Sequence, residues 1–250
     1  MLKLELTLPT AAENIALDEA LLDACAAGEI DRGVLRIWEP DRYFVVLGRS
    51  SRPEVEVNLE ACRREGVPVL RRASGGGTIL AGPGCLMYAV VLSYRDYPEL
   101  RAIDRAHQFA RQRLVDSLSQ WMPTARTAGT SDLAIETVEK SLQKFSGNAL
   151  RAKRTHLVYH GTLLYDFDLD RLAQLLATPT REPEYREGRE HTDFVANLPL
   201  SHVQLITALT TGWQATELLT EWPQERTQAI VCEKYRDDPK WAILQQFQTP

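Results

Sequence analysis

The stretch of sequence best suited to hold a charged ligand runs from Arg71 to Thr78 and reads RRASGGGT. Five of the chain's 14 glycines fall between Gly75 and Gly84, so backbone freedom is concentrated there. Residues without a Cβ let backbone N–H groups approach a ligand closely, and the two arginines upstream add cationic donors for a phosphate or a carboxylate. Neither GxxxxGK[ST] nor GxGxxG is present, which excludes a Walker loop and a dinucleotide fingerprint. Alone, the stretch fits an anion-binding loop and a glycine-rich hairpin with solvated arginines equally well.

A second candidate is Lys144, which precedes small residues on a predicted strand, in the segment QKFSGNA from Gln143 to Ala149. A lysine beside a polyphosphate can neutralise the charge that builds up during attack at the α-phosphorus. Surface lysines are also very common. Without other context, an exposed strand lysine next to a glycine turn is the better explanation of this segment.

The elements that must position these residues do not alternate regularly between strand and helix, which favours an α+β layered sheet over a doubly wound fold. We expect a first helix from Thr10 to Gly28, a hairpin of VLRIWEP and YFVVLGRS, and a short helix from Asn58 to Glu65. Strands are expected on both sides of the glycine-rich stretch. Further along we expect the helix Ile103 to Trp121, the strands LAIETVEK, KFSGNALRA and THLVYHGTLLYDF, the helix Asp168 to Leu176, and two helices between Ser201 and Tyr235.

Composition limits the classes of protein that this chain can belong to. Its 250 residues can bury a sizeable core, and a formal net charge of −5 argues against a general nucleic-acid binder. Four widely spaced cysteines without a CxxC pair argue against a zinc ribbon or a disulfide framework and fit free thiols in a reducing compartment. Because no signal peptide and no membrane-length apolar run is found, we expect a soluble cytoplasmic protein without nucleic-acid or membrane partners.

Short motifs follow one another from Asn14 to Trp241. They are N-x-A-x-D-E-A-L (Asn14 to Leu21), G-R (Gly48, Arg49), R-R-x-S-G-G-G (Arg71 to Gly77), D-L (Asp132, Leu133), K-x-S-G-x-A (Lys144 to Ala149), H-G-T-L-L (His160 to Leu164) and a final Y-x-x-x-x-x-W (Tyr235, Trp241). In this order they resemble the lipoate–protein ligase A family, within the biotin/lipoate protein ligase catalytic-domain superfamily. Each motif is modestly specific, and their ordered occurrence carries the resemblance.

The resemblance implies a fold and an activity. The fold would be a mixed or antiparallel β-sheet flanked by helices, a class II synthetase-like catalytic domain. Residues 1–250 would form one such domain, without the small C-terminal accessory domain of many ligases. The activity would be ATP-dependent, Mg²⁺-assisted conversion of lipoate or octanoate to an acyl-adenylate, followed by transfer of the acyl group to a lysine of a lipoyl-carrier protein. A separate accessory-domain subunit is a further expected partner.

The resemblance also assigns residues. Lys144 would be catalytic and would touch both the phosphate and the acyl carbonyl. Substrate and nucleotide binding would fall to Arg49, Arg72, Ser74, Gly75, Gly76, Gly77, Thr78, Asp132, Ser146, Gly147, Ala149, His160, Gly161 and Thr162. Asp132 would in addition be a Mg²⁺ ligand. No residue suggests itself as the general base for the acceptor lysine.

The chain departs from the family pattern at a few positions. Ala81 and Gly82 stand where many ligases carry His-Asp, Ser131 stands in place of Asn before D-L, and Tyr159 replaces the first His of H-H-G. These changes affect nucleotide or metal contacts more than the fold. Two other activities therefore stay open: an ATP-independent octanoyl or lipoyl transferase of the same fold, and a non-catalytic binder of lipoyl groups.

Several other side chains could carry chemistry. Cys85 lies next to the glycine-rich stretch, but its apolar neighbours indicate a buried thiol rather than the activated one that a thioester needs. His156 and His160 lie on one predicted strand, where four residues span about 13 Å, so they do not chelate one metal. The basic run from Arg151 to Arg154 is either a solvated strand end or a docking patch for an acidic carrier.

Overall fold

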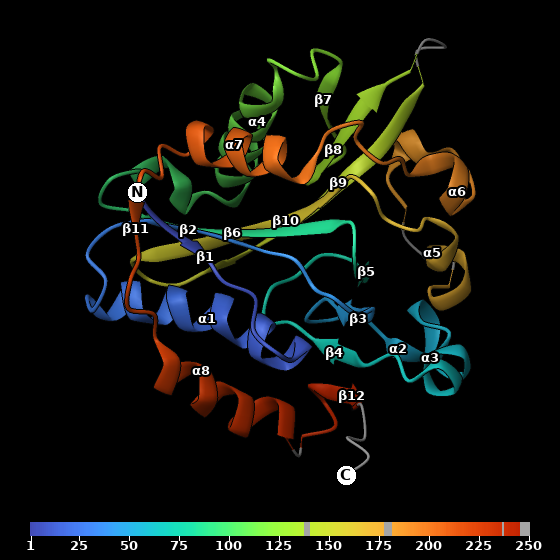
Figure 1. The fold of residues 1–250 in the computed structure, drawn as a ribbon, viewed down its shortest axis with the longest axis horizontal. Coiled ribbons are helices and arrows are strands. Elements are labelled where there is room, and N and C mark those ends of the chain that lie inside the picture. Colours follow the sequence, from blue (N-terminus) through green and yellow to red (C-terminus); the bar gives the residue numbers. More distant parts are fainter. Residues whose placement is uncertain (138–140, 178–181, 237, 246–250) are drawn as a thin grey trace.

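The structure is a computed structural model that describes residues 1–137, 141–177, 182–236 and 238–245 (Figure 1). Within these ranges eight strands form one large sheet in the order β11-β1-β2-β6-β10-β9-β8-β7. Strand β1 runs parallel to β2 and β11, and the other neighbours are antiparallel. The bounds are β1 Leu2–Glu5, β2 Val34–Trp38, β6 Cys85–Ser93, β7 Ala125–Ala128, β8 Asp132–Glu136, β9 Leu142–Ala152, β10 His156–Leu164 and β11 Glu217–Leu218.

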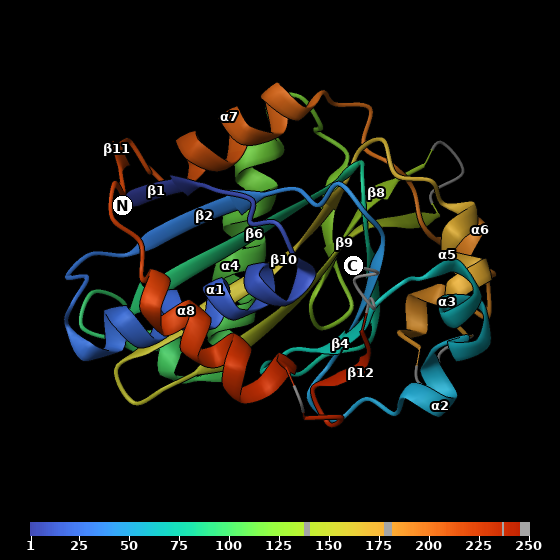
Figure 2. The same cartoon turned by 60° about the horizontal axis from the view of Figure 1, so that its bottom comes forward.

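Both faces of the large sheet are covered by helices, which explains why its central strands are apolar almost throughout. Figures 1 and 2 show α1 (Ala11–Ala27) and α8 (Gln224–Ile230) on one face and α4 (Ile103–Leu118) and α7 (His202–Gly212) on the other. Alternate residues of β2 and β6 separate accordingly. Leu35 and Tyr88 pack in the core beneath α4 and α7, whereas Val34 and Val91 pack against α1.

Helix α1 shows how local sequence signals define an element of the site. Thr10 and Glu13 form a reciprocal capping box at its start, and Gly28 ends it in the left-handed conformation with a φ of 80°. These features confirm the predicted first helix. Its sheet-facing side is not purely apolar, because Asn14, Asp18 and Glu19 are buried there.

The smaller sheet has the order β12-β4-β3-β5 within the described residues and carries the glycine-rich loop between two of its strands. Its strands are β3 Phe44–Leu47, β4 Val69–Arg71, β5 Ile79–Ala81 and β12 Ala242–Leu244. The predicted hairpin of VLRIWEP and YFVVLGRS is wrong, since β2 and β3 belong to different sheets. Both edges of β2 are occupied by β1 and β6, which leaves β3 to pair with β4 and β5.

The remaining elements follow the sequence signals closely. Asn58 caps α3 (Leu59–Glu65), which ends at Gly66 as predicted. The other short helices are α2 (Pro53–Glu56), η1 (Pro98–Arg101), α5 (Asp170–Leu175), η2 (Glu184–Arg186), α6 (His191–Phe194) and η3 (Val231–Arg236). The last three residues of the predicted strand LAIETVEK, 138–140, lie outside the described residues. No helix in the described ranges is long and apolar enough to cross a membrane.

Candidate active site

A cavity of about 90 Å³ lies between α1, the glycine-rich loop and strands of both sheets. Nine of the residues predicted for the site line it: Arg72, Gly77, Thr78, Asp132, Lys144, Gly147, Ala149, His160 and Gly161. The fold therefore brings the glycine-rich stretch, the D-L strand, the lysine segment and the H-G-T strand to one place. The other six predicted residues, Arg49, Ser74, Gly75, Gly76, Ser146 and Thr162, lie beside this lining rather than in it.

Lys144 faces the cavity because of an irregularity in the strand that carries it. Leu133 pairs with Ser146 but Ala134 pairs with Lys144, so Phe145 is an extra residue in β9. Such a bulge changes the direction of neighbouring side chains. As a result Lys144 and Gly147 face the same side although three positions separate them: a Cβ on Gly147 would lie 3.1 Å from the Lys144 Nζ.

The Lys144 ammonium is held by Asp132, whose Oδ1 lies 2.8 Å away. The Tyr185 hydroxyl donates to the other oxygen, Oδ2, at 2.9 Å. Burial and the neighbouring carboxylate raise the pKa of Tyr185, so its hydroxyl stays a proton donor. Both oxygens of Asp132 are therefore engaged. Tyr185 was missed by sequence reasoning, since nothing in the local pattern of η2 indicates a contact with β8.

Arg72 acts as a clamp on the glycine-rich loop. Its guanidinium donates to Ser74 Oγ at 3.0 Å, to the Val46 carbonyl at 3.2 Å, and to the Gly75 and Gly77 carbonyls at 2.6 and 2.9 Å. Burial lowers the pKa of Arg72 to about 10, which leaves the side chain protonated at neutral pH. These bonds use four of the five guanidinium N–H groups and leave one on Nη1 for a ligand.

The loop is also fixed from the β3 side. The Arg49 backbone N–H donates to the Ser74 carbonyl at 2.9 Å, while its side chain is exposed. A Cβ on Gly48 would lie 1.9 Å from the Gly76 carbonyl oxygen, so only glycine permits this approach. At the far end of the loop, Thr78 donates to the Glu56 carboxylate at 2.6 Å. Gly75, Gly76 and Gly77 are exposed between these anchors.

A continuous hydrogen-bonded chain joins α1 to the loop. Arg36 of β2 lies 2.6 Å from Oδ1 of Asp18, Oδ2 of Asp18 lies 3.3 Å from His160 Nδ1, and His160 Nε2 lies 2.7 Å from Ser74 Oγ. Burial opposes ionisation of Asp18, but the Arg36 charge and the bonds from both partners outweigh it and lower its pKa. Asp18 is thus a buried carboxylate of the site that the sequence reasoning did not predict, although it belongs to the N-x-A-x-D-E-A-L motif.

Ser146 and Thr162 support the site from behind. Asn148 contacts the Tyr88 hydroxyl, donates to the Ser131 carbonyl at 2.7 Å and bonds to Ser146. Thr162 accepts from the Gly147 N–H at 3.3 Å. These bonds tie β8, β9 and β10 together at the depth of Lys144.

One wall of the cavity is apolar. It is formed by Ile15 of α1, Trp38 of β2, Val46 of β3, Ile79 of β5 and Met87 of β6. Such a wall suits an aliphatic chain, and the polar groups opposite suit a carboxylate or phosphate. Sequence reasoning missed these residues, because they have the same types and spacing as other core positions.

The side chains of the described residues do not form a metal site made of protein ligands alone. Among the described residues, no group of three or more His, Cys, Asp or Glu side chains could hold a metal ion. A single carboxylate, Asp132, remains beside Lys144. That fits Mg²⁺ held chiefly by substrate phosphates with one or two protein carboxylates.

The cysteines are poorly placed for nucleophilic catalysis. Cys25, Cys62 and Cys85 are buried, and Cys232 is exposed. Burial raises the pKa of Cys25 to about 12 and that of Cys62 to about 11, and it raises the pKa of Cys85 as well. At neutral pH these three thiols are therefore protonated and weak nucleophiles.

Alkylation tests this description of the thiols. Iodoacetamide at about pH 8 should modify Cys232 in the folded protein and leave the three buried thiols unmodified until urea is added. Mass spectrometry of tryptic peptides locates the adducts. Rapid alkylation of Cys85 in the folded protein would contradict its assignment as structural.

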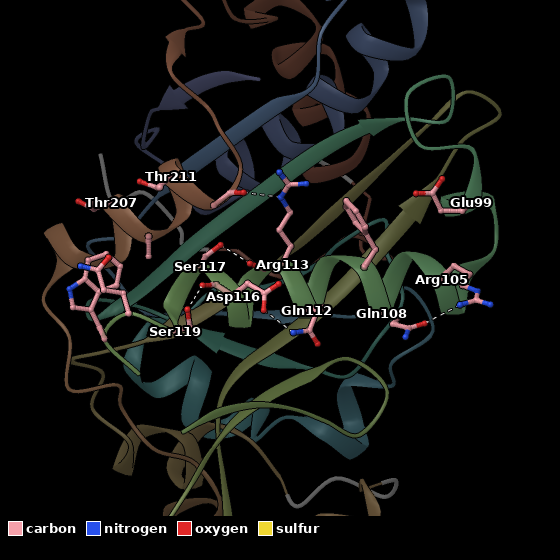
Figure 3. A pocket seen from close by; sticks show the side chains of 15 residues that line it. Glu99, Arg105, Gln108, Gln112, Arg113, Asp116, Ser117, Ser119, Thr207 and Thr211 are labelled. Carbon is pink, nitrogen blue, oxygen red and sulfur yellow. Dashed lines mark hydrogen bonds between the residues drawn. The ribbon is translucent and has the colours of Figure 1, made fainter. Parts of the chain in front are cut away.

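A larger cavity, about 910 Å³, lies elsewhere, between α4 and α7 (Figure 3). Arg113 crosses it and donates to the Gly212 carbonyl at 2.8 Å. None of the predicted site residues lines this cavity, so neither the glycine-rich loop nor Lys144 borders it. The smaller cavity is the better candidate.

Two residues of the basic run at the end of β9 form ion pairs. Arg151 lies 3.0 Å from Glu19, and Lys153 forms an ion pair with Asp23, both on α1. This pairing favours a solvated strand end over a docking patch for an acidic partner.

Comparison with known proteins places these features in context. Residues 10–207 match the model of the family described as the lipoyl protein ligase A/B catalytic domain. A protein from Aeropyrum pernix provisionally assigned as lipoate-protein ligase A is 30% identical over 209 residues, which cover 83% of this chain and 72% of that protein.

Two solved structures share the fold. A bipartite lipoate protein ligase from Thermoplasma acidophilum, described with its E2 lipoyl domain, has a TM-score of 0.76 and 24% identity, covering 96% of this chain and 94% of the other. A lipoate-protein ligase A bound with ATP has a TM-score of 0.73 and 24% identity, covering 96% and 98%. The predicted α+β fold of a lipoate or biotin ligase catalytic domain is confirmed.

Proposed function

Because the chain belongs to the lipoyl protein ligase A/B catalytic-domain family, we propose that it activates lipoate or octanoate with ATP and transfers the acyl group to a lysine of a lipoyl-carrier domain. It is an enzyme of the ligase class, as the sequence resemblance implied. The substrate carboxylate attacks the α-phosphorus of ATP, pyrophosphate leaves, and an acyl-adenylate remains for the second step.

The convergence of three unlike surfaces in one cavity carries this proposal. The Lys144 ammonium, the glycine-rich loop and an apolar wall all border the same 90 Å³ space. An acyl-adenylate has an aliphatic chain, a carbonyl and a phosphate in sequence, so it needs all three kinds of surface side by side. The aliphatic chain lies against the wall formed by Ile15, Trp38, Val46, Ile79 and Met87.

Lys144 changes partners in this mechanism. Without nucleotide its ammonium is neutralised by Asp132 at 2.8 Å. The triphosphate brings more negative charge than one carboxylate, so it draws the ammonium toward the α-phosphate. There the lysine offsets the charge that grows during attack, which is where a cation accelerates the reaction most.

Asp132 then becomes free to serve a metal ion. We propose that Asp132 would hold Mg²⁺ beside the substrate phosphates, because this ion usually binds through few protein carboxylates. When bound, the ion neutralises charge on the triphosphate. Tyr185 keeps its bond to Oδ2 and holds the carboxylate in place.

The exposed glycines 75–77 face the incoming groups. Their backbone N–H groups bind phosphate or acyl oxygens, and Arg72 keeps the loop shaped for this by holding its carbonyls. The mixed anhydride is protected from water when the loop lies over it.

The partners follow from the relative in T. acidophilum, which is described as bipartite and with its E2 lipoyl domain. We propose a lipoyl domain as the acceptor for this chain and a separate accessory subunit that completes activation. The described residues then supply the catalytic domain.

Lipoate-dependent ATP–pyrophosphate exchange tests the function. We expect radiolabel from pyrophosphate to enter ATP only when lipoate or octanoate is present, with or without an added accessory subunit. Acyl transfer to a lipoyl domain in the absence of ATP would identify an ATP-independent transferase instead. Tight lipoate binding without exchange or transfer would identify a non-catalytic binder.

A further inference from the structure

The second half-reaction needs a proton acceptor. A lysine side chain has an ordinary pKa of about 10.4, so the acceptor amine arrives as an ammonium and must lose a proton before it can attack. The side chain that takes this proton must lie in the cavity where the acyl carbonyl is held. The titratable side chains that line it among the described residues are Asp18, Arg72, Asp132, Lys144 and His160.

Four of these five are unsuited to the task. Lys144 and Arg72 are cations. Asp132 accepts from Tyr185 at Oδ2, and the proposed mechanism uses its other oxygen for Mg²⁺ once Lys144 has moved to the phosphate. Asp18 is paired with Arg36 at 2.6 Å, and that charge helps to stabilise its ionised form. Histidine is the side chain whose charge changes between pH 5 and 8, and His160 is the cavity residue of this type.

The hydrogen bonds around His160 determine which ring nitrogen is free to accept a proton. The ionised Asp18 carboxylate can only accept, so the neutral His160 ring carries its proton on Nδ1, and Nε2 accepts from the Ser74 hydroxyl at 2.7 Å. The Ser74 oxygen in turn accepts from Arg72 Nε at 3.0 Å. Nε2 is therefore the acceptor. The proton of the neutral ring sits on Nδ1, which faces the Asp18 carboxylate at 3.3 Å. A base whose second nitrogen is oriented by a carboxylate is the arrangement that general-base catalysis uses.

We propose that His160 is the general base of the acyl-transfer step and that Asp18 is its positioning residue. This inference rests on the proposed function. Nε2 takes one proton from the acceptor ammonium as the amine displaces the Ser74 hydroxyl from it. The amine forms a C–N bond to the acyl carbonyl, the C–O bond to AMP breaks, and AMP leaves with the electron pair. The remaining excess proton on nitrogen passes to the leaving phosphate, and His160 later returns its proton to solvent.

The charged groups around His160 both stabilise and oppose the imidazolium that forms when it takes a proton. Asp18 of α1 stabilises the imidazolium through Nδ1, while Arg36 of β2 and Arg72 before the loop oppose it. Lys144 and Asp132, which also line the cavity, form a neutral pair before nucleotide binds. The side chain is 16% exposed, so an amine entering the cavity can reach it.

The test compares two nucleophiles in order to distinguish a general-base role of His160 from a structural one. The acyl donor is chemically prepared octanoyl-AMP, and the nucleophile is either a lipoyl-domain lysine or hydroxylamine, which is already uncharged near neutral pH. His160→Asn retains an amide near the Nδ1 position for Asp18, and His160→Gln retains one near the Nε2 position for Ser74. In both variants we expect the ratio of lysine transfer to hydroxylamine transfer to fall by about 100-fold.

The pH dependence gives a second reading. In the unmodified enzyme, the pH profile of lysine transfer should contain a break that the His160 variants lack, and hydroxylamine transfer should show only the break that protonation of hydroxylamine itself produces. In the variants the break should be lost, and the lysine rate should keep rising with pH as free amine accumulates. Equal losses for both nucleophiles, or identical pH profiles for them in the unmodified enzyme, would overturn the proposal.

A matched control comes from the same strand. His156 lies at the start of β10 outside the cavity, and His156→Gln should leave both rates unchanged. Because octanoyl-AMP bypasses activation, this experiment is independent of ATP–pyrophosphate exchange. Absence of exchange and of transfer in the unmodified enzyme would instead count against the proposed function itself.

Discussion

Replacing Lys144 with alanine should lower the rate of lipoate-dependent ATP–pyrophosphate exchange by about 100- to 1000-fold, the usual cost of removing one group that stabilises transition-state charge. The effect should fall mainly on kcat, because the ammonium is neutralised by Asp132 at 2.8 Å before reaction and gains its full value only as charge develops on the phosphate. Exchange kinetics at saturating lipoate and ATP measure it.

Lys153 provides a matched control for this substitution. Its side chain is 32% exposed against 28% for Lys144, and each lysine is paired with an aspartate. Lys153 lies beyond the end of β9 and outside the cavity. Lys153→Ala should therefore retain full exchange. Equal losses in the two variants would show that general electrostatics, rather than a catalytic contact, determine the rate.

Replacing Arg36 with methionine should destabilise the folded protein by about 3–5 kcal/mol, because it leaves the buried Asp18 carboxylate without its cation. The Arg36 side chain is fully buried and that of Asp18 is 9% exposed. Arg36 also donates to the carbonyls of Leu6 and Asn14, which lose a partner in the variant. Urea unfolding at pH 7, followed by circular dichroism, measures the change.

Two comparisons identify the buried ion pair as the cause. Arg32→Met removes an exposed arginine that pairs with Glu217, and it should change stability little, since surface pairs contribute little. The difference between the unmodified protein and Arg36→Met should also depend on pH. The folded-state pKa of Asp18 is lowered, so its contribution is complete above the ordinary value of 3.8 and is lost as pH falls through the lower folded value. A gap that widens on acidification would contradict this explanation.

Elements with local signals could be predicted from the sequence. The Thr10–Glu13 capping box and Gly28 define α1, and Asn58 and Gly66 define α3. These signals depend only on neighbours within one or two turns. The glycine-rich stretch and the Lys144 segment were each ambiguous alone, and their order within the family pattern brought them into one predicted site. In the structure residues of both segments line the same cavity.

Features that depend on pairing between distant strands could not be predicted. The bulge at Phe145 arises from the register of β8 against β9, and it decides which side chains accompany Lys144 into the cavity. The contact of Asp18 with His160 joins residues 142 positions apart. The false hairpin of β2 and β3 has the same origin, since the local pattern could not show that β1 and β6 already occupy both edges of β2.

The separation of the site between two sheets has a practical consequence for redesign. Val46 and Ile79 of the apolar wall belong to the small sheet, whereas Lys144 and His160 belong to the large one. Substitutions at Val46 and Ile79 can change the width or length of the apolar part of the cavity. They leave in place the strand pairing of the large sheet, which positions Lys144 and His160. A small library at these two positions is therefore a direct starting point for variants that attach unnatural carboxylic acids to carrier lysines.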